Sequence, residues 1–157
     1  MSDIQRVGVV GAGQMGSGIA EVCAKAGLDV RVAETTGEAL ELGRARLTTS
    51  LGKAAERGKI TEQERDAALD RLSFTTDLGE FADRDLVIEA VVENEQVKTD
   101  IFRVLDQVVT RRDAILASNT SSIPPAGTAV FGFGGTVQGT AAVPSSFTLN
   151  GAACAKG

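Results

Sequence analysis

Short apolar runs alternate with longer stretches of mixed polarity through the first 118 residues of the chain. Runs of strand length, rich in valine, leucine and isoleucine, lie at 7–10, 28–33, 72–75, 85–92 and 114–117. Such runs are typical of parallel strands that are covered on both faces. Longer segments between them predict helices after residue 13 and over 38–57, 61–71 and 95–109, with a turn or short helix at 77–81. This alternation predicts an α/β fold.

Three local signals set the ends of the predicted helices. Gly27 and Gly58 stand where a helix C-terminus favours a residue with positive φ. Thr61 and Glu64 have the spacing of a capping box, in which the two side chains satisfy each other's backbone N–H groups. The interval between the second and third strands therefore holds two helices, an excursion longer than a minimal crossover.

The first strand runs directly into a glycine-rich turn. Gly11, Gly13 and Gly16 form G-x-G-x-x-G, in which the first glycine permits a tight turn and the second permits backbone to approach a pyrophosphate. The third lets the helix pack closely on the strand, and the helix N-terminus favours the phosphate charge. The motif predicts a Rossmann-type doubly wound parallel sheet.

An acidic residue ends the second strand at the distance expected of a dinucleotide-binding domain. Glu34 lies 18 residues past Gly16, where a carboxylate holds the ribose hydroxyls of the adenosine. A carboxylate also repels a 2′-phosphate, so the cofactor is predicted to be NAD rather than NADP. The alternative is that the glycines serve packing alone and that Glu34 is a solvated strand end.

Four features that suit ligand binding follow strands of the predicted sheet. They are the glycine turn, Glu34, Glu93-Asn94 and the segment 118–122. Because ligands of open α/β sheets bind beyond the carboxyl ends of the strands, these features are expected to converge on one binding site.

Composition limits the other classes of function. A chain of 157 residues with 43% hydrophobic and 24% charged residues suits one globular core. The net charge of −5 gives no basic field for nucleic acid, and no apolar run reaches the length of a membrane span. The two cysteines make no disulfide framework. We predict a cytoplasmic protein, with no nucleic-acid, membrane or metal partner.

The composition changes after residue 123. Residues 124–157 hold one charged side chain, Lys156, and are rich in Gly, Ala, Thr, Val and Ser. Segments 128–133 and 136–140 could pair as a hairpin around Gly134-Gly135, or the glycines could leave the tail poorly ordered. The predicted organisation is therefore an NAD-binding domain over 1–123 and a tail over 124–157.

Residues 4–123 resemble the N-terminal half of the L-3-hydroxyacyl-CoA dehydrogenase family, which includes the bacterial 3-hydroxybutyryl-CoA dehydrogenases. The resemblance rests on GAGQMGSGIA at 11–20, DLVIEAV at 85–91, Glu93-Asn94 with Val97-Lys98, and SNTSS at 118–122. Many dehydrogenases share the glycine motif, whereas the last two motifs in this order are more specific. The resemblance implies an oxidoreductase of fatty acid metabolism that passes a hydride between NAD and a 3-hydroxyacyl-CoA.

The resemblance also implies roles for individual residues. Along NAD, the turn would hold the pyrophosphate, Glu34 the adenosine ribose, and the remaining residues the nicotinamide side; the full set is Gly11, Gly13, Gln14, Met15, Gly16, Glu34, Glu93 and Lys98. Asn119 would approach the nicotinamide ribose and substrate, and Ser121 would hydrogen-bond the reacting substrate oxygen. Ser50 and Arg57 would meet the coenzyme A of acetoacetyl-CoA or 3-hydroxybutyryl-CoA. Five of these residues have a plain alternative: Ser121 as a turn residue, Glu93 as a helix cap, Lys98 and Arg57 as solvated helix charges, and Ser50 as an ordinary mid-helix residue.

One departure from the family is severe. Downstream of Ser118 the family has a His-Phe-Phe-Asn-Pro segment whose histidine is the general base, oriented by a later glutamate. Here that region reads Ala141-Ala142-Val143-Pro144, and the chain contains no histidine. The family's helical C-terminal domain is also absent, so the chain is expected to be a truncated form. Uncovered apolar surface predicts self-association.

Two principal hypotheses follow. The first is an NAD-dependent 3-hydroxyacyl-CoA dehydrogenase. We expect this chain alone to be poorly active, because it lacks the family's catalytic histidine and a positioned base contributes about 10²–10⁴ in rate. The alternative is a non-catalytic NAD-binding module. A 3-hydroxyacid dehydrogenase of another family ranks behind both, since such enzymes place a catalytic lysine late in the chain and residues 124–155 have none.

Overall fold

The computed structural model describes residues 4–119, 147–149 and 152–154. Its main sheet has five parallel strands in the order β3-β2-β1-β4-β5. The strands are β1 (Arg6–Val10), β2 (Asp29–Ala33), β3 (Leu72–Thr75), β4 (Leu86–Glu89) and β5 (Ile115–Ser118). The strand order reverses between β1 and β4, which is the switch point of a doubly wound sheet. The predicted fold class is confirmed.

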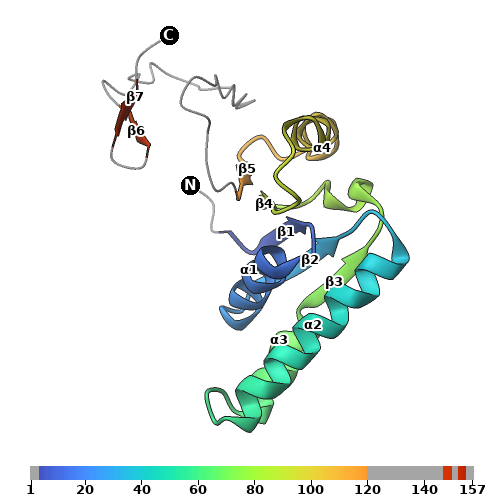
Figure 1. Cartoon of the computed structure of the whole chain (residues 1–157), viewed down its shortest axis with the longest axis vertical. Coiled ribbons are helices and arrows are strands. Elements are labelled where there is room, and N and C mark those ends of the chain that lie inside the picture. Colours follow the sequence, from blue (N-terminus) through green and yellow to red (C-terminus); the bar gives the residue numbers. More distant parts are fainter. Residues whose placement is uncertain (1–3, 120–146, 150–151, 155–157) are drawn as a thin grey trace.

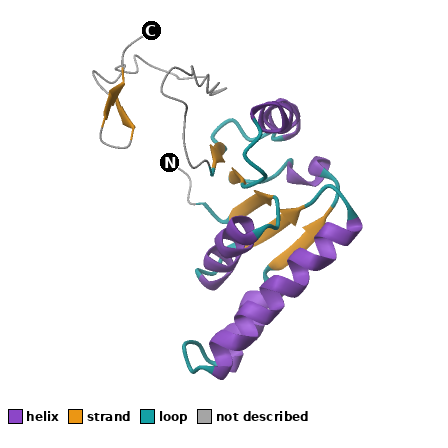
Figure 2. Ribbon diagram, viewed as in Figure 1, coloured by secondary structure: helices purple, strands orange, loops and turns teal. Residues whose placement is uncertain are grey.

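Helices cover both faces of this sheet (Figure 1). They are α1 (Gln14–Lys25), α2 (Gly37–Glu56), α3 (Glu62–Asp70), the 3₁₀ helix η1 (Leu78–Phe81) and α4 (Glu95–Val108). Helices α2 and α3 form the predicted excursion between β2 and β3. They lie against each other and project from the sheet as an antiparallel pair (Figure 2).

The predicted local signals all operate at the helix ends. After α1, the N–H of Gly27 (φ 94°) bonds to the Ala24 carbonyl and that of Leu28 to the Cys23 carbonyl, which is a Schellman motif. Gly58 (φ 67°) ends α2 with the same pattern. Thr61 and Glu64 form the capping box at the start of α3.

The core lies in two layers because β1 side chains alternate between the sheet faces. Val7 and Val9 pack with α1, α2 and α3 on one face. Val10 packs on the other face with Phe81 and with Leu105 of α4. Gly8 makes this second layer possible, since a Cβ there would lie 2.6 Å from the Phe81 ring.

Some strand boundaries differ from those predicted. The apolar run 85–92 predicts eight residues of strand, yet β4 ends at Glu89, because its neighbour β1 ends at Val10 and turns away through Gly11. Strand β5 begins one residue later than predicted and includes Ser118, which pairs with Glu89. Periodicity detects an apolar run, but partner strands decide how much of it is paired.

The hairpin predicted over 128–140 falls outside the described residues. In the tail, the structure describes β6 (Phe147–Leu149) and β7 (Ala152–Cys154), which pair antiparallel with Phe147 opposite Cys154. Among the helices of the described ranges, none has the length and apolar character needed to cross a membrane.

A charged cluster lies at the amino ends of β1 and β4. The Oδ2 of buried Asp85 accepts hydrogen bonds from the backbone N–H groups of Gln5 (2.9 Å) and Arg6 (2.7 Å). Its Oδ1 lies 2.8 Å from Nη1 of Arg111. Burial acts to raise the pKa of Asp85, but the two N–H groups and the charges of Arg111 and Arg6 outweigh it and hold this pKa below its ordinary value.

The Asp85 contacts predict a loss of stability in acid. Since the pKa is lower in the folded state, this stabilisation is complete above the ordinary carboxyl pKa and disappears as pH falls through the folded value. Asp85→Asn should lower the free energy of unfolding by about 2 kcal/mol at neutral pH. It should also flatten the decline of stability in acid, measured by urea unfolding across the acidic range.

Asp100→Asn, which alters an exposed ion pair on α4, is the matched control and should change little. A decline in acid that is equally steep in Asp85→Asn and the unmodified chain would contradict this assignment.

Candidate functional site

Close backbone packing shapes the glycine turn between β1 and α1. Gly11 has φ of 101°, and a Cβ there would lie 2.7 Å from the Ala90 carbonyl oxygen. A Cβ on Gly16 would overlap the carbonyl oxygen of Gly11. Gly13 differs, because a Cβ there would have no neighbour within 4 Å. Gly11 and Gly16 are therefore needed by the fold, whereas Gly13 borders open space.

The peptide groups of Ala12 are held from several directions. Its N–H donates to Oε1 of Glu34 (2.6 Å), and its carbonyl accepts from the Ser17 hydroxyl (2.8 Å) and the Arg46 guanidinium. Arg46 reaches the turn because α2 passes close by, where a Cβ on Gly43 would overlap that of Ala12. These contacts fix the turn in position.

Glu34 retains capacity to bind a ligand while it holds the turn. Its Oε2 accepts from the Thr35 N–H at 3.2 Å, so each carboxylate oxygen has one protein donor. An ionised carboxylate has about four lone-pair sites, which leaves room for ribose hydroxyls. Glu34 therefore lies beside the turn as predicted.

The N-terminus of α1 is open. Its N-cap is Gly13, which has no capping side chain, and no acidic residue lies in the first turn. Gln14 and Met15 are exposed there, with Met15 57% exposed. The first N–H groups of a helix lack intrahelical partners and attract anions. This end of α1 is therefore suited to a phosphate group.

A second polar group lies where β4 and β5 end. Glu89 is fully buried, and its Oε2 accepts from the Ser118 hydroxyl at 2.6 Å. Lys98, from the first turn of α4, brings Nζ to 3.1 Å from the same oxygen. The Lys98 ammonium also lies 3.4 Å from Glu93 Oε2 and donates to the Asn119 carbonyl at 3.0 Å.

Helix α4 is capped by Asn94, not Glu93. The Asn94 side chain accepts from the Val97 N–H at 3.1 Å. The capping role considered for Glu93 therefore belongs to its neighbour, and the Glu93 carboxylate faces Lys98 instead.

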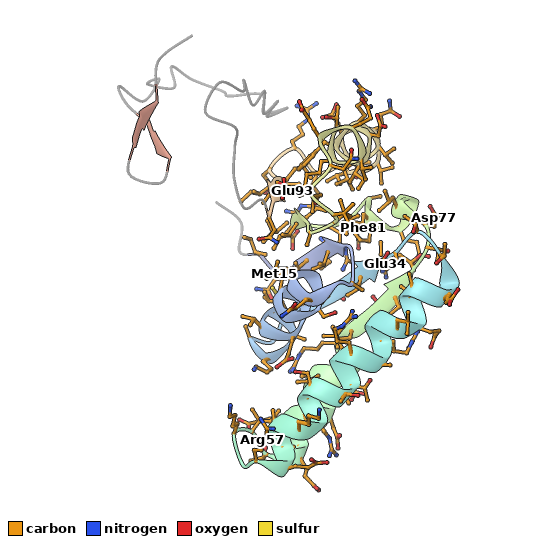
Figure 3. The ribbon with its side chains drawn as sticks, viewed as in Figure 1. Met15, Glu34, Arg57, Asp77, Phe81 and Glu93 are labelled. Carbon is orange, nitrogen blue, oxygen red and sulfur yellow. The ribbon has the colours of Figure 1, made fainter. Side chains whose placement is uncertain are left out.

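The strand register joins the two groups along one edge. Val10 pairs with Ala33 on one side and with Glu89 on the other, and Glu89 pairs with Ser118. The glycine turn, Glu34, Glu93 and Asn119 follow these strand ends, and Figure 3 shows the labelled Met15, Glu34 and Glu93 in this part of the molecule. Ser121 lies outside the described residues, so its role stays a prediction.

Ser50 and Arg57 lie elsewhere: Arg57 is at the far end of the α2–α3 pair (Figure 3), and Ser50 lies within α2 and lines the same pocket. They line a pocket of about 310 Å³ with three lysines. The basic residues of this pocket are Lys25, Lys53, Arg57 and Lys59, and Glu21 is its acidic member. We call it the basic pocket.

Sequence reasoning missed Arg46, Ser17 and Glu89. Arg46 and Ser17 act through contacts with a backbone carbonyl, which leave no pattern in the sequence. Glu89 did carry a signal, because a charged residue inside an apolar strand is rarely buried without a partner.

Together, the doubly wound sheet, the glycine turn and the acidic residue after β2 define a dinucleotide-binding domain of the dehydrogenase type. Comparison with known proteins gives the particular family. The chain belongs to the family "3-hydroxyacyl-CoA dehydrogenase, NAD binding domain", which matches residues 6–130. The predicted family and the predicted cofactor, NAD, are thereby confirmed.

Individual relatives agree with this assignment. The chain is 64% identical over 125 residues to a 3-hydroxybutyryl-CoA dehydrogenase of Mycobacterium tuberculosis, covering 79% of this chain and 44% of that relative. The crystal structure of FadB2 from M. tuberculosis superposes with a TM-score of 0.77 at 63% identity, over 78% of this chain and 43% of that one.

A further crystal structure, (S)-3-hydroxybutyryl-CoA dehydrogenase from Ralstonia eutropha, gives a TM-score of 0.73 at 40% identity. The match covers 77% of this chain and 42% of that one. The chain thus spans less than half the length of the relatives that it matches.

The packing of the turn predicts opposite effects for two glycines of α1. Gly16→Ala should lower the free energy of unfolding by about 3 kcal/mol, because the methyl group overlaps the Gly11 carbonyl. Gly18→Ala, in the same helix but with open space at its Cβ, should raise it by about 0.5 kcal/mol. Urea unfolding followed by circular dichroism measures both, and equal stability of the two variants would refute the close approach.

Proposed function

We propose that this chain binds NAD(H) along the carboxyl edge of its sheet and is the cofactor-binding part of a 3-hydroxybutyryl-CoA dehydrogenase. One observation carries the proposal: the turn is closely packed at Gly11 and Gly16 and open at Gly13. A turn that served packing alone would not need the middle glycine. The names of the relatives support the choice of substrate.

The residues at the adenosine end fit this cofactor. The pyrophosphate would take the open N–H groups at the start of α1, and Gly13, Gln14 and Met15 would border it. The free lone pairs of Glu34 would accept the ribose hydroxyls. The same negative charge disfavours a 2′-phosphate, which supports NAD over NADP.

Glu93, Lys98 and Asn119 would hold the nicotinamide end. When bound, NAD supplies the site that accepts or returns a hydride. Lys98 would offer its ammonium to hydroxyl or carbonyl oxygens of the ligand, and Asn119 its side-chain amide. Ser121 would donate a hydrogen bond to the substrate oxygen, as its place in the family motif implies.

The proton step is the weak point of this chain. Oxidation of an alcohol needs a group that takes the hydroxyl proton, and the family uses a histidine that this chain lacks. A positioned base contributes about 10²–10⁴ in rate, so we propose that the chain alone binds the cofactor and turns over substrate poorly. The alternative function is a non-catalytic NAD-binding module.

The basic pocket would hold the phosphates of coenzyme A. It contains the two residues implied by the family resemblance, Ser50 and Arg57, together with three lysines. Glu21 pairs with Lys25 at 3.2 Å, so the pocket keeps a net positive charge. Charged hydrogen bonds from lysine and arginine are the strong contacts available to phosphate.

NADH binding tests the proposal at the turn. We expect saturable binding of NADH to the full chain in calorimetric titration, abolished by Gly13→Val, because the side chain would fill the space left open for the pyrophosphate. Gly52→Val, at an equally open position on α2, should leave NADH binding unchanged, and it should not destabilise the helix because valine disfavours a helix less than glycine does.

Turnover is measured on the same samples by following NADH absorbance with acetoacetyl-CoA. We expect binding without appreciable reduction. Normal turnover would contradict the proposed dependence on histidine, whereas absence of NADH binding would contradict the proposed function as a whole.

The basic pocket predicts binding of free coenzyme A. Arg57→Gln should weaken CoA binding by about tenfold, the loss of one charged hydrogen bond, and added salt should weaken it further. Arg103→Gln removes an exposed charge on α4, which does not line the pocket, and should leave CoA affinity unchanged. If both substitutions have the same effect, binding reflects overall charge and the pocket assignment is wrong.

A further inference from the structure

Glu89 is a fully buried carboxylate at the end of a core strand. The residue is 0% exposed, and its strand is otherwise apolar. Burying a carboxylate is costly unless charge and hydrogen bonds compensate it. A nonpolar residue would fill this position without that cost. The groups that Glu89 binds therefore indicate the role of its carboxylate.

Three donors fix the Glu89 carboxylate. Oε1 accepts from the Val91 N–H at 2.7 Å, and Oε2 accepts from the Ser118 hydroxyl at 2.6 Å. The Lys98 ammonium lies 3.1 Å from Oε2. Since these donors come from the loop after β4, from β5 and from α4, the carboxylate joins three elements at the sheet edge.

Lys98 depends more on Glu89 than on its other carboxylate. The side chain of Glu93 is 51% exposed and lies 3.4 Å from Nζ, so solvent and salt screen it. Glu89 is closer and shielded from solvent. The Lys98 side chain is itself only 12% exposed. Its ammonium lies between the buried Glu89 carboxylate and the edge of the sheet at which the strands end, where we propose that the ligand binds.

We propose that Glu89 is a positioning residue for the nicotinamide end of the site: it holds the Lys98 ammonium where the cofactor meets it. The inference rests on the proposed function, because it takes Lys98 as a cofactor contact. Glu89 itself lies beneath the edge and acts on the cofactor through Lys98, while the Ser118 hydroxyl holds the carboxylate oxygen that faces the ammonium.

Glu89→Gln removes the charge with little change of shape. The amide oxygen can face Val91 N–H or Lys98, but not both, so the amide NH₂ then faces another donor. The Lys98 ammonium loses its buried counter-ion and is expected to shift toward exposed Glu93.

The experiment is a double-mutant cycle on NADH binding by the full chain. Calorimetry compares the unmodified chain, Glu89→Gln, Lys98→Met and the double variant. We expect Glu89→Gln to weaken NADH binding by about tenfold. In the Lys98→Met background the same substitution should change affinity less than twofold, because its effect passes through Lys98.

The cycle separates positioning from a general structural role. A loss of equal size in both backgrounds would overturn the proposal, as would unchanged binding by Glu89→Gln or by Lys98→Met. Failure of the unmodified chain to bind NADH would instead remove the proposed function, and this inference with it. Glu41→Gln, in an exposed ion pair with Arg44 on α2, controls for the change of net charge.

Urea unfolding without NADH identifies any variant that does not fold. If Glu89→Gln is unfolded, Ser118→Ala replaces it, because it removes the hydroxyl that holds Oε2. Ser118→Ala should weaken NADH binding severalfold in the unmodified chain and leave it unchanged in Lys98→Met. Equal losses, or no loss, would overturn the proposal.

Discussion

The approach of α1 to the end of β1 is the constraint on which the carboxyl edge depends. Gly16 lies against the Gly11 carbonyl without room for a methyl group, and Gly11 in turn lies against the backbone of Ala90. These contacts set the direction of α1 and bring its N-terminus over the switch point between β1 and β4. Glu34, just after β2, and Arg46 of α2 then hold Ala12, so both of these elements are tied to the turn.

Strand β4 carries charge at both of its ends, and the two ends differ in their partners. Asp85, just before β4, is occupied by two backbone N–H groups and by Arg111 within the fold. Glu89, its last residue, holds a lysine that also reaches the half-exposed Glu93. The Asp85 cluster serves the fold, because all of its partners are groups within the folded chain. The Glu89 cluster extends from the core to the carboxyl edge of the sheet, so it connects the packing of β4 to the proposed cofactor contacts.

The parts of the fold that were predictable from sequence depend on short separations along the chain. Gly27, Gly58 and the Thr61–Glu64 capping box act across a few residues, so their patterns are legible in the sequence. The sheet edge was predictable as well, because parallel strands bring their carboxyl ends together whatever the side chains do. The end of β4 was not, since it depends on where β1 turns away.

Contacts between residues far apart in the sequence could not be predicted, because they depend on how whole elements pack against one another. Arg46 meets Ala12 only because α2 crosses the turn at Gly43, and Ser118 meets Glu89 only because the β4–β5 register aligns the two residues. In both cases the residue types are common and the separation is long. The burial of Glu89 was the one accessible clue, and it required the strand to be recognised as central.

Helix α2 links the two proposed binding regions. Arg46 contacts the glycine turn, whereas Ser50 and Lys53 line the basic pocket, with Arg57 just past the helix end. At 1.5 Å per residue, Arg46 and Arg57 are separated by about 16 Å along the helix axis. A ligand that reached both regions would therefore have to be extended, with its phosphates at the pocket and its reacting end toward the sheet. An acyl-CoA has this form, so the α2–α3 pair, whose Leu47, Leu51 and Ala68 pack in the core of the sheet, would also carry the proposed substrate from the basic pocket toward the sheet edge.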